Sequence, residues 1–421
     1  MLKPNPESDI RQQMRARALA IRTAGGIDAA LAKGALPKLI ETTLSEGLVL
    51  GLLKQGVRKY LAIFGHGSTD LGEVLRIYEQ AGVTRTYNCR NEVAMAHAAT
   101  VLRWQYGEIP AVVTSIGPGA MQAFAGSLAS ASNGVGVYHI YGDETTFGEG
   151  YNMQQVPKHE QHLFGQMTAI MGRSYVLHTP QALREALRRG ALTVNHPYRA
   201  GPFYLLLPLN TQPAPLTVNL AALPDRPKFP PLAPAGDAEF ERAAQLIAST
   251  ARIAIKAGGG TRGHDAAMRK LAETAGAAVV LSPGSTGVLP DAHVQNMHVG
   301  GSKGSISGNF AMASAELLIV IGSRAVCQAD CSGIGYKSAK YVINVNGDLD
   351  DVSHYNNTLA LPGDITQVVE RLTASVLALS KKIKADQRLN SSEARASWLA
   401  SCSEKKAEWS RYKHEIGRAH V

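Results

Sequence analysis

The chain has 421 residues, 45% of them hydrophobic and 18% charged, and 43 Lys and Arg residues against 34 Asp and Glu residues give a formal net charge of +9. This length predicts two or three domains, because a single hydrophobic core stops growing beyond roughly 250–300 residues. The basic residues are scattered without a dense run, and no apolar run reaches the roughly 20 residues that span a bilayer, so we expect a cytoplasmic protein with neither nucleic acid nor membrane as a partner.

The first segment, residues 1–37, has a polar, Arg-rich pattern that predicts a helical extension exposed to solvent and ending at Gly34 and Pro37. Residues 43–46, with the sequence TLSE, then show the capping-box pattern of a helix N-terminus before an apolar run. We expect this helix to open a first domain over residues 38–212.

Strand and helix patterns alternate through this first domain. The expected strands are residues 60–64, 84–87, 111–114, 135–141 and 202–208, and the expected helices are residues 71–80, 92–106, 120–130 and 181–192. This order predicts an α/β fold with a doubly wound parallel sheet, since a crossover helix joins each parallel strand to the next. The strands are nearly all apolar, as strands covered by helices on both faces should be.

A proline-rich stretch separates the first domain from a second one. Prolines crowd residues 213–235 without periodicity, which predicts a linker. A second doubly wound domain is expected over residues 236–378. Its expected strands are residues 252–256, 277–281, 317–321 and 341–345, with a helix at residues 265–275. Residues 379–421 are mostly charged and predict a connecting helix and a tail.

The four cysteines are Cys89, Cys327, Cys331 and Cys402, too few for a disulfide framework in a chain of this length. Cys327 and Cys331 are four residues apart and would share one face of a helix. No second Cys or His pair at zinc spacing lies near them in the sequence. We therefore expect free thiols and no metal site at these residues.

One acidic residue and one glycine turn stand out in the first domain. Glu92 opens an expected helix, where the helix dipole alone favours a carboxylate by about 0.3–1 kcal/mol. About twenty residues further on, residues 115–120, with the sequence SIGPGA, join a strand to a helix. Glycines in such a turn allow close backbone approach, and the helix N-terminus offers free N–H groups. Taken singly, each feature also fits an ordinary helix start or a tight strand–helix connection.

Glu92 followed by a strand, a GPGA turn and a tightly packing helix resembles the pyrimidine-binding domain of thiamine diphosphate enzymes. The resemblance implies that Glu92 hydrogen-bonds the aminopyrimidine ring of the cofactor and so promotes loss of the proton from its thiazolium carbon. It also implies cofactor contacts from the turn and the start of the next helix, namely Gly117, Pro118, Gly119 and Gln122. The family has Asn-rich or Ala-rich positions where this chain has Met121 and Gln122.

Three short segments resemble one branch of this family, the enzymes that hydrolyse 3D-(3,5/4)-trihydroxycyclohexane-1,2-dione in inositol breakdown. They are residues 64–68 (FGHGS), Cys89 just before Glu92, and residues 154–156 (QQV). In this reading His66 lines the substrate end of the site as a proton carrier or hydrogen-bond donor, and Gln155 contacts the cofactor. An acetolactate synthase-like decarboxylase and carboligase acting on 2-oxoacids is the alternative, and His66 would otherwise be a solvated loop residue.

The second domain contains a competing signal. Gly258, Gly260 and Gly263 follow an expected strand and satisfy the pattern G-x-G-x-x-G of dinucleotide-binding domains, which leaves a dinucleotide-binding oxidoreductase open. The acidic residue expected about 20 residues later, which would bind the ribose, is missing from the sequence. Thiamine diphosphate enzymes carry a Rossmann-like central domain with a glycine turn here, which is structural in most members and holds FAD or ADP in some.

The resemblance covers roughly residues 42–378, the pyrimidine-binding and central domains, and implies a third domain that holds Mg²⁺ and the diphosphate. Its Gly-Asp-Gly segment is not found, since residues 347–349 (GDL) lack the second glycine. We therefore expect an inactive fragment of a homodimeric or tetrameric enzyme whose cofactor lies between subunits. Residues 415–421 can be back-translated into a sequencing adapter, which suggests a truncated gene fragment with adapter read-through. A non-catalytic subunit that completes the site of a separate chain is the alternative.

Overall fold

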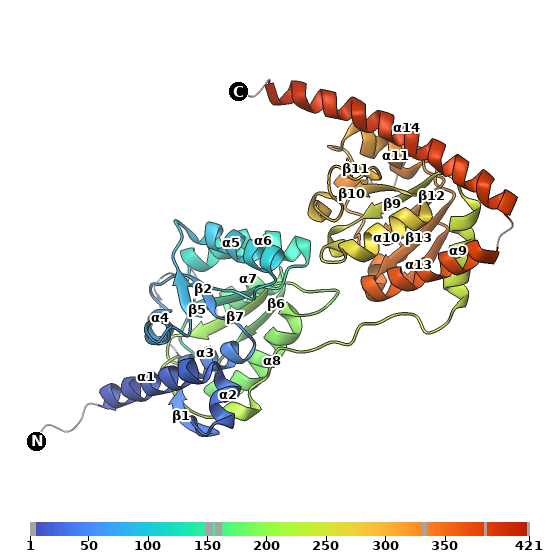
Figure 1. Ribbon diagram of the computed structural model, residues 1–421. Coiled ribbons are helices and arrows are strands. Elements are labelled where there is room, and N and C mark those ends of the chain that lie inside the picture. Colours follow the sequence, from blue (N-terminus) through green and yellow to red (C-terminus); the bar gives the residue numbers. More distant parts are fainter. Residues whose placement is uncertain (1–5, 148–154, 156–161, 331–334, 383–384, 419–421) are drawn as a thin grey trace, which may run out of the picture. The chain divides into compact units, whose positions relative to one another are not determined.

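The computed structural model describes residues 6–147, 155, 162–330, 335–382 and 385–418. The chain divides into two compact units, residues 1–229 and 230–421. Each unit contains one parallel six-stranded sheet flanked by helices, which confirms the predicted α/β fold with two doubly wound sheets (Figure 1). Within the described residues, no helix is long and apolar enough to cross a membrane.

The sheet of the first unit has the strand order β3-β2-β4-β5-β7-β6, and all its strands are parallel. The strands are β2 (Lys59–Ile63), β3 (Arg85–Tyr87), β4 (Ala111–Thr114), β5 (Tyr138–Asp143), β6 (Arg173–Val176) and β7 (Phe203–Pro208). The helices are α1 (Pro6–Ala24), α2 (Ile27–Ala32), α3 (Leu44–Lys54), α4 (Thr69–Gln80), α5 (Glu92–Tyr106), α6 (Pro118–Asn133), α7 (Leu163–Ala169) and α8 (Leu183–Val194). Strand β6 at the edge of this sheet was not predicted from the sequence.

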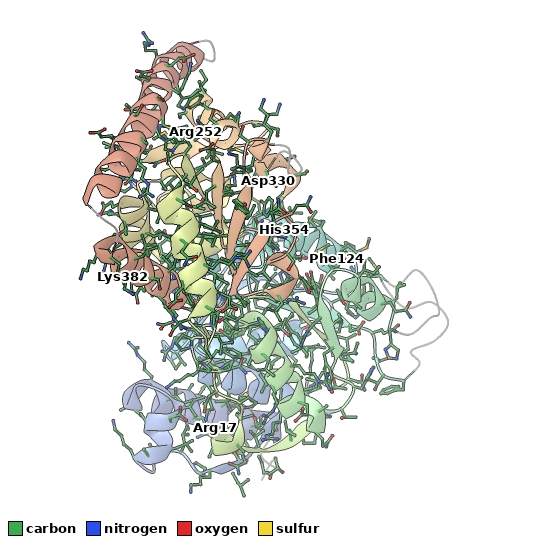
Figure 2. All side chains as sticks on the ribbon, turned by 90° about the vertical axis from the view of Figure 1, so that its right-hand side faces the viewer. Arg17, Phe124, Arg252, Asp330, His354 and Lys382 are labelled. Carbon is green, nitrogen blue, oxygen red and sulfur yellow. The ribbon has the colours of Figure 1, made fainter. Side chains whose placement is uncertain are left out.

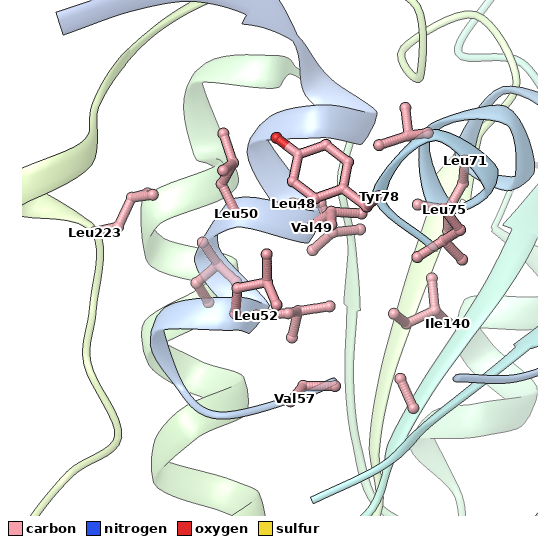
Figure 3. Packing of buried hydrophobic residues seen from close by; sticks show 14 of the residues in the cluster. Leu48, Val49, Leu50, Leu52, Val57, Leu71, Leu75, Tyr78, Ile140 and Leu223 are labelled. Carbon is pink, nitrogen blue, oxygen red and sulfur yellow. The ribbon is translucent and has the colours of Figure 1, made fainter. Parts of the chain in front are cut away.

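Successive side chains of the central strands point to opposite faces, as the pleat requires. Along β4, Ala111 and Val113 join a core with residues of α1, α3, α4 and α8, whereas Val112 joins a second core with residues of α5, α6 and α7. Figure 3 shows part of the first core, where Tyr78 of α4 lies beside leucines of α3. Helices therefore cover both faces of the sheet, and the strand–helix turns lie together at its carboxyl edge.

The N-terminal helix α1 packs against the first unit. Met14, Ala18 and Ile21 are buried on one face of α1 and belong to its core. Arg17, labelled in Figure 2, donates from Nε to Oε1 of Glu46 at 2.9 Å and from Nη2 to Oε2 at 2.5 Å. Residues that we expected in a solvated extension are thus buried, because the apolar and charged positions of α1 repeat at helical spacing.

The helix predicted to follow the TLSE segment is α3. Thr43 is its N-cap and accepts a hydrogen bond from the backbone N–H of Glu46 at 3.3 Å, but the carboxylate of Glu46 does not complete the capping box. It accepts instead from Arg17 and, at 2.7 Å, from the Tyr78 hydroxyl. The strand before α3, β1 (Leu39–Thr43), pairs antiparallel with β8 (Pro215–Asn219), which lies in the stretch that we expected to be a linker.

The second unit has a parallel sheet with the strand order β11-β10-β9-β12-β13-β14. The strands are β9 (Ile253–Ala257), β10 (Ala278–Leu281), β11 (Asn296–Val299), β12 (Leu317–Ile321), β13 (Tyr341–Asn346) and β14 (Thr358–Pro362). The helices are α9 (Ala238–Ser249), α10 (Asp265–Ala275), α11 (Ile306–Ser314), α12 (Cys327–Asp330), α13 (Ile365–Lys382) and α14 (Ala385–Arg418). The edge strands β11 and β14 were not predicted.

The last helix, α14, packs against this second unit rather than extending away from it. The indole N–H of Trp398 donates to the backbone oxygen of Ile253 at 3.1 Å, and its ring stacks on Phe310 of α11 with centroids 5.9 Å apart. Cys402, one turn further on, is fully buried. In Figure 1 α14 runs alongside α11, so part of the expected tail belongs to the core of the second unit.

Candidate active site

Glu92 is the first residue of α5, at the carboxyl edge of the first sheet. The side chain of Asn91 caps the helix by accepting from the backbone N–H of Ala94 at 2.8 Å. Glu92 is only 9% exposed, and no hydrogen bond or ion pair to its carboxylate is found among the described residues. Without a donor or a cation among those residues, this carboxylate makes no hydrogen bond or ion pair that would stabilise the fold. It is available to a partner other than the described residues.

The carboxylate of Glu92 faces the glycine turn that follows β4. A Cβ atom added to Gly119 would stand 2.9 Å from Oε1 of Glu92 and 2.9 Å from Oγ of Ser115. Two turns of α6 further on, a Cβ atom on Gly126 would stand 2.9 Å from Cβ of Ala96. The small residues of α5 and α6 therefore let the two helices approach closely, and this brings Glu92 to the start of α6.

Gly117 begins the turn with a φ of 68°, a backbone conformation that glycine adopts without strain. A Cβ atom at Gly117 would stand 2.8 Å from Cβ of Gln155, so Gln155 lies directly against the turn. Pro118 is exposed at the first position of α6, and no side chain caps this helix. Gln122 is also exposed, one turn after Gly119. The structure thus brings Glu92, the turn and Gln155 together.

The loop that carries His66 adjoins the same turn. The backbone N–H of Ile116 donates to the backbone oxygen of His66 at 3.0 Å. A Cβ atom at Gly67 would stand 2.5 Å from Cγ1 of Ile116, and one at Gly142 would stand 2.5 Å from the oxygen of Gly67. The loops after β2 and β4 therefore meet the carboxyl end of β5 at one edge, the place where parallel sheets bind ligands. The His66 side chain itself is exposed to solvent.

Asp143, the last residue of β5, is a site residue that the sequence analysis missed. It is 1% exposed, and its Oδ1 atom has no hydrogen-bond partner among the described residues. Burial raises the pKa of this carboxyl to about 7, although a hydrogen bond from the backbone of Glu144 lowers it; the charge of Glu144 acts in the same direction as burial. An acid directly after an apolar strand was the signal in the sequence, but its burial depends on loops from elsewhere in the chain.

Two glycines of the G-x-G-x-x-G segment in the second unit contact another turn of the same unit. The backbone N–H of Gly258 donates to Ile321 at 2.8 Å, and that of Gly260 donates to Gly322 at 3.0 Å. A Cβ atom on Gly258 would stand 2.2 Å from the oxygen of Gly322, so this glycine permits two strand–helix turns to touch. These donors are not free to bind a phosphate, and α10 begins only at Asp265. The geometry favours a structural role for the G-x-G-x-x-G segment.

Comparison with protein families gives two matches that follow the two units. Residues 42–166 match the thiamine pyrophosphate enzyme N-terminal TPP binding domain. Residues 240–372 match the thiamine pyrophosphate enzyme central domain. Together the two matches cover more than half of the chain, and the first includes every candidate residue of the site. In the part of the chain that the structure describes, no cluster of three or more His, Cys, Asp or Glu side chains is placed to hold a metal ion.

The individual relatives are named for two different enzyme activities. The chain is 26% identical over 350 residues to a probable acetolactate synthase large subunit from Methanocaldococcus jannaschii, covering 81% of this chain and 57% of that protein. It is 26% identical over 303 residues to a 3D-(3,5/4)-trihydroxycyclohexane-1,2-dione hydrolase from Bacillus velezensis, covering 69% of this chain and 47% of that protein. The acetolactate synthase isozyme 3 large subunit of Escherichia coli is 24% identical over 343 residues, 78% of this chain and 57% of that subunit. The chain spans about half the length of these relatives.

Proposed function

Because this chain belongs to the thiamine pyrophosphate enzyme family, we propose that its first unit provides the pyrimidine-binding part of an active site that breaks a C–C bond next to a carbonyl group. The observation that carries this proposal is Glu92, a largely buried residue whose carboxylate lies against Gly119 of the GPGA turn and has no partner among the described residues. The cofactor would lie between subunits of a homo-oligomer, with the ligands of Mg²⁺ and the diphosphate in a further domain. The enzyme would act on a small molecule in the cytoplasm.

The residues present fit the aminopyrimidine part of thiamine diphosphate. Glu92 offers a carboxylate that lacks a partner among the described residues, and the missing side chains of Gly117 and Gly119 let Gln155 and this carboxylate lie directly against the turn. When bound, the cofactor supplies a nucleophilic carbon and an electron sink for the cleaved bond. Glu92 would hold a proton against the ring nitrogen of the pyrimidine. Gln155 and Gln122 would bound the pocket, and His66 would exchange a proton with the substrate.

As the reaction we propose ring-opening hydrolysis of trihydroxycyclohexane-1,2-dione in inositol catabolism. Its support is the relative named for this hydrolysis, together with the FGHG loop and Gln155, which the structure brings against one turn. The second candidate is condensation of 2-oxoacids after decarboxylation. It is favoured by the acetolactate synthase of M. jannaschii, which aligns over a larger share of this chain.

The test uses the protein expressed from its complete gene, assayed with thiamine diphosphate and Mg²⁺ against the cyclic dione and against pyruvate. Ring-opened product from the dione supports the hydrolase, whereas acetolactate from pyruvate supports the second candidate. The variant Glu92→Gln should lower kcat by about 10²–10⁴-fold, the range for loss of a proton-transfer group. Asp265→Asn, a change at the first residue of α10 in the second unit, is the matched control and should retain activity. Full activity of Glu92→Gln would refute the assignment of Glu92.

A further inference from the structure

The carboxyl ends of the neighbouring strands β5, β7 and β6 border a cavity of about 410 Å³. Its polar lining includes Asp143, Glu144, Thr145, Thr146, His162 and His178, and we call it the acidic cavity. The volume lies within the range of small-molecule pockets, roughly 300–1,000 Å³. The cavity adjoins the candidate site, because Asp143 follows Gly142, which touches the His66 loop at Gly67.

Asp143 is the polar group of this cavity that most needs a partner. It is almost fully buried, and one of its carboxyl oxygens has no hydrogen-bond donor among the described residues. The free energy cost of such an atom is large, and native proteins retain few of them. A ligand hydroxyl that donates to this carboxyl would remove that cost.

The other walls of the cavity are held in place by hydrogen bonds within the unit. Oε1 of Glu144 accepts from the backbone N–H of His162 at 2.7 Å. The amide of Asn210 binds both the backbone N–H and the hydroxyl of Thr146, at 3.0 and 2.8 Å. The rings of His162 and His178 meet edge to face with centroids 4.6 Å apart. The cavity therefore presents fixed acceptors, hydroxyl groups and imidazoles that can bind several hydroxyl groups at once.

The acidic side chains that line the cavity disfavour an anionic ligand. Two carboxyl groups face the cavity, and none of its described lining residues is Lys or Arg. A 2-oxoacid carries a carboxylate, which proteins recognise with Arg, Lys or clustered N–H donors. Burial raises the pKa of Asp143 to about 7, so this carboxyl is only partly ionised near neutral pH. A neutral ligand rich in hydroxyl groups matches this lining better than either an anion or a multiply charged cation.

We propose that the acidic cavity binds a neutral polyhydroxylated ring through hydroxyl groups that donate to Asp143 and Glu144. This inference rests on the proposed function and deepens it, because it favours a polyhydroxylated cyclic substrate over a 2-oxoacid. Asp143 would be a specificity residue, whereas Glu92 acts on the cofactor.

The probe is myo-inositol, a neutral cyclic polyol, titrated into the 421-residue chain at about pH 8, where Asp143 is mostly ionised. Imidazole ¹H–¹⁵N signals of His162 and His178 report directly on the cavity. They should shift and saturate with a Kd of roughly millimolar order, which is usual for a ligand of this size. Pyruvate at the same concentrations should leave them unshifted. Saturable binding of pyruvate at least as tight as that of myo-inositol would overturn the proposal, as would no response to myo-inositol.

The variant Asp143→Asn keeps the shape of the side chain and should fold. It should weaken myo-inositol binding by about tenfold, because a hydrogen bond to a charged acceptor is worth more than one to a neutral acceptor. Asp70→Asn is the matched control. Asp70 is a part-buried acid of the same unit whose Oδ2 also lacks a partner among the described residues, and it does not line the cavity. This control should bind like the parent chain. Equal affinity of Asp143→Asn and the parent would overturn the proposal.

A negative result for binding to the acidic cavity can be distinguished from a negative result for the proposed function. Cavity binding is measured on this chain without cofactor, whereas the function is tested by turnover of the complete protein and its dependence on Glu92. If myo-inositol does not bind to the cavity but the complete protein turns over the dione in a Glu92-dependent way, only the specificity proposal is refuted. Selective myo-inositol binding without any turnover supports the cavity and removes the enzyme assignment.

Discussion

Two acidic residues at the carboxyl edge of the first sheet differ in what surrounds them. Glu92 stands at a capped helix start against a glycine turn, and its position relative to the GPGA segment was predicted from the sequence. Asp143 ends a buried strand, and its removal from water raises the pKa of its carboxyl to about 7. Its pKa depends on residues from several loops, so the sequence alone did not indicate it. A buried acid of this kind reduces stability and is typical of functional sites.

Replacing Asp143 by Asn should stabilise the protein at alkaline pH. The folded-state pKa of about 7 lies above the unfolded value of 3.8, so the cost of ionising Asp143 is absent below about pH 4 and grows as the pH rises to 7. Three pKa units correspond to about 4 kcal/mol as an upper bound. Urea unfolding at about pH 8 should give Asp143→Asn the higher midpoint, and the difference should shrink towards pH 4. A variant that is less stable than the parent at both values would contradict this account.

At the scale of elements, the parallel core strands were predictable and the sheet edges were not. Strands β4, β7, β9 and β12 are buried along their whole length and mostly apolar because helices cover both faces, and this pattern is local in the sequence. The missed strands β6, β11 and β14 all lie at sheet edges, are only partly buried and carry mixed residues. The two helices of the site, α5 and α6, were predicted to pack tightly from their small residues.

That close packing can be tested at Gly126. A Cβ atom there would stand 2.9 Å from the backbone oxygen of Val93, so Gly126→Leu should push α5 away from α6 and move Glu92. Overpacking of this kind costs about 1–3 kcal/mol of the free energy of unfolding. In the complete protein the KM for thiamine diphosphate should also rise.

Ala125→Leu is the matched control, because Ala125 is the preceding residue of α6 and is exposed. It should leave both the urea midpoint and the KM unchanged. If Gly126→Leu matched this control in both measurements, the close approach of α5 and α6 would not position the site.

At the scale of the whole molecule, each unit has its own parallel sheet and its own hydrophobic cores. The two sheets are similar, but their carboxyl edges differ. At the edge of the first sheet, the carboxylate of Glu92 lies against the GPGA turn and has no partner among the described residues. In the second, Gly258 and Gly260 are occupied by contacts with the turn at Gly322. The sequence pattern at Gly258 suggested a dinucleotide site because the partner turn lies more than sixty residues away in the chain and could not be inferred locally.

The central claim is that Glu92 activates bound thiamine diphosphate. The measurement that tests it most directly is the rate of hydrogen–deuterium exchange at the thiazolium C2 of the cofactor, bound to the complete protein without substrate. We predict fast exchange in the parent and exchange slower by about 10²–10⁴-fold in Glu92→Gln, with the cofactor still bound. Equal exchange rates in the two proteins, at equal cofactor occupancy, would contradict the account.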